Sequence, residues 1–153
     1  MMGKIEKAKV KDGLEIQKII NVYAKEGKML ERSILEIYEN IRDFFVYKKK
    51  GKIVGVAALT ICWEDLAEIR SLAVVKSESK KGVGKRLVRE CINEAKKLGI
   101  KKVFVLTYIP EYFSKFGFKK VSRNDLPHKI WKDCIKCVKF PDCNEVPMVK
   151  EVR

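Results

Sequence analysis

The sequence has little histidine, no long apolar run and fewer acidic than basic side chains. His128 is the only histidine among 153 residues, which excludes metal sites that need several histidine ligands. The longest nearly apolar run, from Ile53 to Trp63, is too short to cross a bilayer. The N-terminal segment is charged and has no apolar stretch of the kind found in secretion signals. We therefore expect a cytoplasmic protein with no membrane partner.

The shortage of acids leaves a formal net charge of +14, which favours anionic partners such as nucleic acid or a polyphosphate. The basic residues are scattered, however, and many stand beside Glu or Asp, as on the surfaces of heat-adapted proteins. No RRM, zinc-finger or basic-zipper pattern occurs. We therefore do not expect nucleic acid as a partner.

The length and the hydrophobic periodicity predict a single α+β domain over residues 1–153, with the tail 122–153 packed on it. Asp12 and Ser33 are predicted N-caps of the first two helices, and Glu36 completes a capping box. Strands that follow one another through short turns, then a strand–helix–strand unit, indicate a mixed sheet that is not purely parallel. The expected strands are 4–11, 44–48, 53–63, 66–75, 103–107, 118–121 and 146–152, and the expected helices are 14–26, 34–41, 83–98 and 110–116.

A glycine-containing loop in the segment 72–92 is the strongest functional signal. A strand leads into a polar loop, and Gly82-Val83-Gly84 then opens an amphipathic helix whose first N–H groups lack internal partners. This arrangement suits a diphosphate, although a loop that merely lets a helix begin would look the same. Ser79 and Arg86 exclude a Walker A loop, and Leu87 excludes the dinucleotide fingerprint, because each stands where those motifs need another residue.

Residues 68–118 resemble the acetyl-CoA-binding core of the GNAT N-acetyltransferase superfamily. The resemblance lies in Leu72-Ala73-Val74, in the loop from Ser79 to Gly84, and in the segment from Tyr112 to Phe118 that ends in Gly-Phe. It implies a GNAT-like α+β fold, with a mixed, mostly antiparallel central sheet flanked by helices, and an enzyme that uses acetyl-CoA. Ser79 replaces the Arg or Gln usual in that family, so we expect weaker cofactor binding. The cofactor-binding residues implied are Leu72, Ala73, Val74, Lys80, Lys81, Gly82, Val83, Gly84, Lys85 and Arg86.

The same resemblance implies direct transfer of the acetyl group from the thioester to an amine. Glu68 is the candidate general base, or else it simply pairs with Arg70 on the same strand face. A backbone N–H near Val74, where the strand splays, is the expected donor to the developing oxyanion. Phe113 stands where the family usually has the tyrosine that acts as general acid. Tyr108 or Tyr112 would then protonate the leaving thiolate, or no general acid is needed.

The segment 23–33 resembles the corresponding part of N-acetylglutamate synthases, so Arg32 is a candidate for binding a substrate carboxylate. Arg70 is a second candidate for substrate binding. Tyr108 stands where those enzymes place another arginine for substrate binding. We therefore expect the substrate to be a small amino acid. Glutamate is one candidate, which would place the enzyme in arginine biosynthesis. Two alternatives stay open: acetylation of a protein or peptide, and a non-catalytic CoA-sensing or nucleic-acid-binding module.

Cysteines divide into two groups. Cys62 and Cys91 fall on apolar patterns and are predicted to be buried. Cys134, Cys137 and Cys143 lie in the tail, where a metal site with His128, disulfides and free thiols are all open; we favour no metal. The segment 146–152 is predicted to form an edge strand that contributes to a homodimer.

Overall fold

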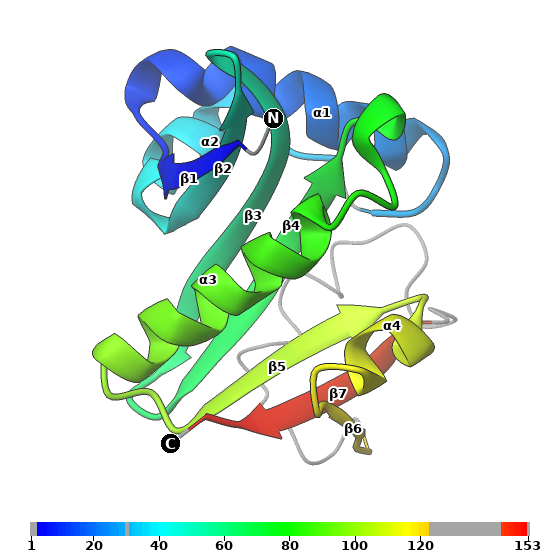
Figure 1. Ribbon diagram of the computed structural model, residues 1–153. Coiled ribbons are helices and arrows are strands. Elements are labelled where there is room, and N and C mark those ends of the chain that lie inside the picture. The colour runs from blue at the N-terminus through cyan, green and yellow to red at the C-terminus, as the bar shows by residue number, and fades with distance from the viewer. Residues whose placement is uncertain (1–2, 30, 123–144, 153) are drawn as a thin grey trace. The chain divides into compact units, whose positions relative to one another are not determined.

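The computed structural model describes residues 3–29, 31–122 and 145–152, and its helices and strands follow the predicted order (Figure 1). Short 3-10 turns precede α1, β2 and α3 at Val10–Asp12, Ile41–Asp43 and Lys76–Glu78. The strands are β1 (Lys4–Lys7), β2 (Phe44–Lys49), β3 (Lys52–Trp63), β4 (Leu66–Val74), β5 (Lys102–Thr107), β6 (Lys119–Lys120) and β7 (Val146–Glu151). The helices are α1 (Gly13–Lys25), α2 (Ile34–Glu39), α3 (Val83–Lys97) and α4 (Pro110–Ser114).

The strands hydrogen-bond in the order β1-β2-β3-β4-β5-β7-β6. Antiparallel ladders join β1 to β2, β2 to β3, β5 to β7 and β6 to β7, whereas β4 and β5 are parallel. This confirms the predicted α+β fold with a mixed, mostly antiparallel sheet. The prediction of an edge strand at 146–152 is wrong, because β7 pairs with β5 on one side and with β6 on the other.

The chain divides into two compact units. The first comprises residues 1–60 and 69–94, and the second comprises 61–68 and 95–153. In the first unit α3 lies in front of β3, with α1 and α2 behind the strands (Figure 1). Its core joins α1, α2, β2 and β3 through fully buried residues that include Ile16, Ile20, Ile37, Val46 and Val56.

The two predicted N-caps differ in outcome. Ser33 caps α2 as expected, since its Oγ accepts a hydrogen bond of 3.1 Å from the Glu36 N–H. Asp12 does not cap α1. Its own backbone is already helical because a 3-10 turn runs directly into α1, and its carboxylate instead accepts a 2.8 Å hydrogen bond from the Lys9 N–H. The Lys48 ammonium lies 3.5 Å from the same carboxylate.

In the second unit β5 pairs with β4 at Glu68↔Phe104 and with β7 along its whole length. Phe104 and Met148 are fully buried there. The ring of Phe113 on α4 packs edge-on against Phe118, with ring centres 5.6 Å apart, and Gly117 between them takes a φ of 90°. Phe113 therefore belongs to the core.

Two cysteines fall among the described residues. Cys91 is fully buried as predicted, and burial raises the pKa of its thiol to about 12. Cys62 is half-buried beside Leu66 and Phe104 rather than fully enclosed. Within the described part of the chain no group of His, Cys, Asp and Glu is arranged to hold a metal, and no helix is long and apolar enough to span a bilayer. His128, Cys134, Cys137 and Cys143 lie outside the described residues.

Candidate active site

The predicted phosphate loop joins the end of β4 to the start of α3. Lys80 and Gly82 both have positive φ, 65° and 86°, so the chain turns sharply before the helix begins. The first helical hydrogen bond runs from the Arg86 N–H to the Gly82 carbonyl at 3.1 Å. The N–H groups of the first turn are thus the ones that a helix leaves without internal partners. At Gly82 a Cβ atom would meet nothing within 4 Å, so glycine is needed there for its conformation, not for space.

Ser79 is turned back into the loop. Its hydroxyl donates a 2.8 Å hydrogen bond to the Lys76 carbonyl, which closes the 3-10 turn at 76–78. The residue that replaces the family's Arg or Gln therefore stabilises the loop itself. Any charge offered to an anion here has to come from other side chains.

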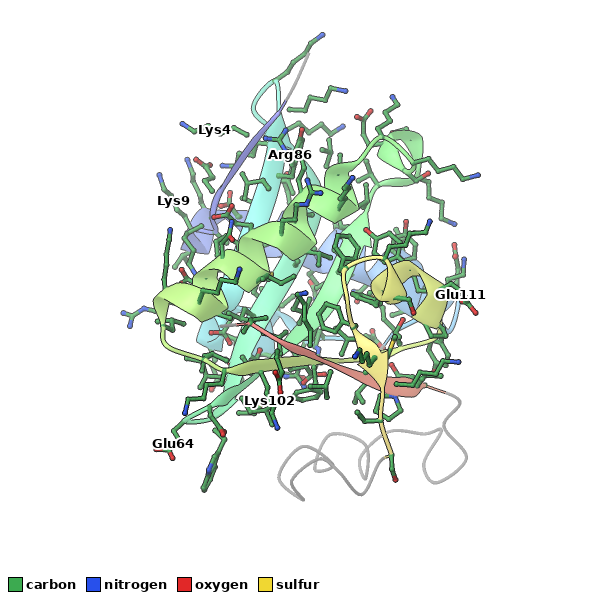
Figure 2. The ribbon with its side chains drawn as sticks, turned by 60° about the horizontal axis from the view of Figure 1, so that its bottom comes forward. Lys4, Lys9, Glu64, Arg86, Lys102 and Glu111 are labelled. Carbon is green, nitrogen blue, oxygen red and sulfur yellow. The ribbon has the colours of Figure 1, made fainter. Side chains whose placement is uncertain are left out.

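A cavity of about 270 Å³ lies beside the first turns of α3. Five cationic side chains line it, from β2, from the loop and from α3, together with a single acid. Arg86, labelled in Figure 2, projects from the first turns of the helix. The cations and the helix N-terminus together provide the charge and main-chain donors that a diphosphate requires. The lining residues are Tyr47, Lys49, Glu78, Lys81, Gly82, Val83, Lys85, Arg86 and Arg89.

Half of the predicted cofactor residues line this cavity: Lys81, Gly82, Val83, Lys85 and Arg86. The others lie in the same unit but not in its lining. Leu72, Ala73 and Val74 form the end of β4, Lys80 is exposed in the loop, and Gly84 is in the first turn of α3.

The side of the cavity that β2 lines, through Tyr47 and Lys49, was not predicted from the sequence. The Tyr47 hydroxyl accepts a 3.0 Å hydrogen bond from Arg86, whose guanidinium lies 5.3 Å from the centre of the Tyr47 ring. Lys49 forms a 2.8 Å ion pair with Glu78, and Lys81 lies 3.4 Å from the same carboxylate. The hydrogen bond from Lys49 lowers the pKa of Glu78 below its usual value. Glu78 is thus the internal counter-ion of the cavity.

Gly55 on β3 sets the position of α3 and was also missed. A Cβ atom there would lie 2.7 Å from Val83 Cγ1 and 3.0 Å from Leu87 Cδ1. Both of these side chains are buried. The absence of a side chain at Gly55 therefore lets the first turn of α3 approach the strand closely. A glycine inside an otherwise apolar strand was the available signal.

Arg32 stands just before α2 with its side chain only 16% exposed. Its guanidinium lies 3.4 Å from the Glu36 carboxylate, and its carbonyl accepts a 3.2 Å hydrogen bond from the Gln17 amide. The residue is therefore held in place, not free in solvent.

Arg70 on β4 is half-buried. Close to it, burial raises the pKa of Asp43, although a 3.3 Å hydrogen bond from Thr60 and the charges of Lys7 and Arg70 oppose the rise.

The three predicted proton-transfer residues belong to the second unit. Glu68 is buried on β4. Tyr108 is half-buried at the end of β5, where the Ile109 N–H donates a 2.9 Å hydrogen bond to Thr107 Oγ1 and fixes the turn. Tyr112 on α4 packs against Phe113 and Phe116, and burial raises its pKa above the usual value. Burial therefore makes the Tyr112 hydroxyl a weaker acid than an exposed tyrosine.

Comparisons with known proteins agree with this geometry. A model of the acetyltransferase (GNAT) family matches residues 14–118. An uncharacterized N-acetyltransferase of Chlorobaculum tepidum is 41% identical over 146 residues, which are 95% of this chain and 94% of that protein. The amino-acid acetyltransferase of Mycobacterium tuberculosis is 31% identical over 133 residues, 84% of this chain and 75% of that protein. The N-acetylglutamate synthase of Neisseria gonorrhoeae, solved with coenzyme A and N-acetyl-glutamate, has a TM-score of 0.91 at 28% identity over 100% of this chain and 36% of its own.

Proposed function

Because this chain belongs to the acetyltransferase (GNAT) family and is an N-acetyltransferase that uses acetyl-CoA, we propose that it acetylates the α-amine of a small amino acid. Glutamate is the first candidate, which would place the enzyme in arginine biosynthesis. The amino-acid acetyltransferase relative and the synthase with bound N-acetyl-glutamate support this substrate class. In this chain the supporting observation is Arg32, whose side chain is only 16% exposed and whose guanidinium is suited to binding a carboxylate.

The proposed chemistry assigns one task to each group. Acetyl-CoA supplies the acetyl group as a thioester. The α3 N-terminus and the cations of the cavity hold its diphosphate. Glu68 takes a proton from the amine, and the Val74 N–H donates to the acyl oxygen as negative charge develops there. Tyr112 and Tyr108 are the two candidates for donating a proton to the leaving thiolate; burial raises the pKa of Tyr112, which makes it a weaker acid than an ordinary tyrosine.

We propose a carboxylate-binding role for Arg32 and a secondary role for Arg70. The pairing of Arg32 with Glu36 supports the first, since the pair orients the guanidinium before a substrate arrives. We also propose that residues 1–153 act as one catalytic domain, which a continuous family match over 14–118 supports. A homodimer and a cytoplasmic location stay predictions.

The experiment is a substrate screen with the purified protein. Thiol release from acetyl-CoA is measured with each amino acid and with short peptides. We expect turnover with glutamate or another small amino acid, and Arg32→Ala should raise its KM at least roughly tenfold while the KM for acetyl-CoA stays constant. Arg42→Ala is the matched control, an exposed arginine in the turn before β2. Turnover of peptides alone would contradict the proposal.

A further inference from the structure

A hydrogen bond, an ion pair and a cation–ring contact connect the C-terminal end of α1 to the end of β4 and the residues that follow it. The Tyr23 hydroxyl donates a 2.5 Å hydrogen bond to the Val74 carbonyl, across 51 residues of sequence. Two residues further on, Lys76 forms an ion pair with Glu26, and its ammonium lies 5.9 Å from the centre of the Tyr23 ring. These interactions connect the same two segments, so the helix end fixes the strand end at several points.

The peptide group between Val74 and Val75 is held from both sides. The Val75 N–H donates a 2.9 Å hydrogen bond to the Val54 carbonyl on β3. In a trans peptide the C=O points away from the N–H, so the Val74 carbonyl points away from β3, where Tyr23 meets it. Because the Val75 N–H and the Val74 carbonyl both make hydrogen bonds, this peptide plane has little freedom to rotate.

The orientation of this peptide matters for the neighbouring N–H. Along an extended strand, the N–H and the C=O of one residue point to the same side. The Val74 N–H therefore faces the side on which Tyr23 holds the Val74 carbonyl. That N–H is the donor assigned above to the acyl oxygen, and such a donor stabilises charge only when it is aimed in advance.

We propose that Tyr23 is a positioning residue for acetyl transfer, whose hydroxyl fixes the 74–75 peptide and so aims the Val74 N–H. The inference rests on the role given to that N–H under the proposed function. The Tyr23 ring has a separate task, since it packs on the core of the first unit together with Met29 and Val75. A phenylalanine would keep that packing and remove only the hydrogen bond.

The test therefore compares Tyr23→Phe with Tyr38→Phe. Tyr38 is 39% exposed on α2, so its variant makes the same chemical change away from β4. The measurements are kcat, the KM for acetyl-CoA, the pH profile of kcat, the melting temperature, and the amide resonances of Val74 and Val75 with and without acetyl-CoA.

We expect kcat of Tyr23→Phe to fall roughly tenfold or more, as a donor displaced by a fraction of an ångström would produce. The KM for acetyl-CoA should stay within about twofold, because ground-state binding does not depend on this donor. Tyr38→Phe should match the wild type in kcat. The Val75 amide resonance should move in Tyr23→Phe alone, since it reports the hydrogen bond to the Val74 carbonyl.

An unchanged kcat in Tyr23→Phe would overturn the proposal. So would a parallel change in kcat, KM and melting temperature, which would indicate a packing role, or loss of the alkaline limb of the pH profile, which would indicate proton donation. If the wild type acetylates no amino acid, the proposed substrate is wrong, and Tyr23 is then judged by the resonances alone. In that case acetyl-CoA should shift the Val74 amide in the wild type but less in Tyr23→Phe, and equal shifts would refute the inference.

Discussion

Glu78 is the single acid in a cavity whose lining includes five cationic side chains. Its carboxylate pairs with Lys49 and Lys81, and its side chain is only 15% exposed. An incoming diphosphate has to compete with it for both ammonium groups. If the cofactor's diphosphate binds in this cavity as proposed, we expect Glu78 to lower its affinity while holding the two lysines in place before it arrives.

We predict that Glu78→Gln binds coenzyme A several-fold more tightly, with a steeper dependence of Kd on salt because both lysines become available. Isothermal titration at two salt concentrations measures this. Glu15→Gln, on the exposed face of α1, removes the same charge elsewhere and should leave Kd unchanged. Weaker binding by Glu78→Gln would mean that the carboxylate orients the lysines more than it competes.

Glu68 is the residue on which proton transfer depends in the proposed mechanism. We predict that Glu68→Gln lowers kcat roughly a hundredfold or more and removes the acidic limb of its pH profile, because the amide cannot accept the proton. Steady-state kinetics between pH 6 and 9 would measure both effects. Glu64→Gln is the control, an exposed acid in the turn between β3 and β4 that is labelled in Figure 2. An equal loss of kcat in Glu68→Gln and Glu64→Gln would show that Glu68 is not the general base.

At the scale of elements, α3 can approach β3 closely because position 55 has no side chain. An alanine Cβ there would press on Val83 and Leu87, and both are buried and cannot move into solvent. We predict that Gly55→Ala costs about 1–3 kcal/mol of stability and also weakens coenzyme A binding, because the N-terminus of α3 is displaced. Denaturant unfolding and a binding titration test the two effects.

Gly99→Ala provides the comparison for that prediction. Gly99 follows α3 with a φ of 80° and open space around it, so alanine costs stability through backbone strain alone. Its affinity for coenzyme A should equal that of the wild type. If Gly55→Ala also kept full affinity, the position of α3 would not govern cofactor binding.

Ion pairs on several elements of the molecule make its folding stability depend on pH. Hydrogen bonds from Lys48, Lys76 and Lys49 lower the pKa of Glu6, Glu26 and Glu78 respectively, below the usual 4.5. A lowered pKa in the folded state means that the unfolded chain binds more protons, so this stabilisation is present above 4.5 and is lost as the pH falls through the lowered values. Protonation also adds to a net charge that is already +14.

We therefore predict a melting temperature that is steady between about pH 5 and 7 and falls progressively below about pH 4.5. Calorimetry across this range at low salt measures it, and Glu6→Gln should show a smaller fall than the wild type. A melting temperature that rose as the solution became more acidic would show that these pairs do not stabilise the folded state.

Features that depend on neighbours along the chain follow from the amino-acid sequence alone. The order of elements, the Ser33 cap on α2 and the glycine turn before α3 all follow from spacings of a few residues, where side chains and backbone meet whatever the rest of the fold does. The family resemblance belongs here too, since its motifs are local.

Contacts between residues that are distant in the sequence depend instead on the folded arrangement of the elements. Tyr23 reaches Val74 across 51 residues and Lys49 reaches Glu78 across 29, and no local pattern encodes such a pairing. Likewise β7 became an inner strand because its two neighbours are chosen by sheet pairing and not by its own alternation. Register and packing between elements, set by the whole core at once, place these side chains.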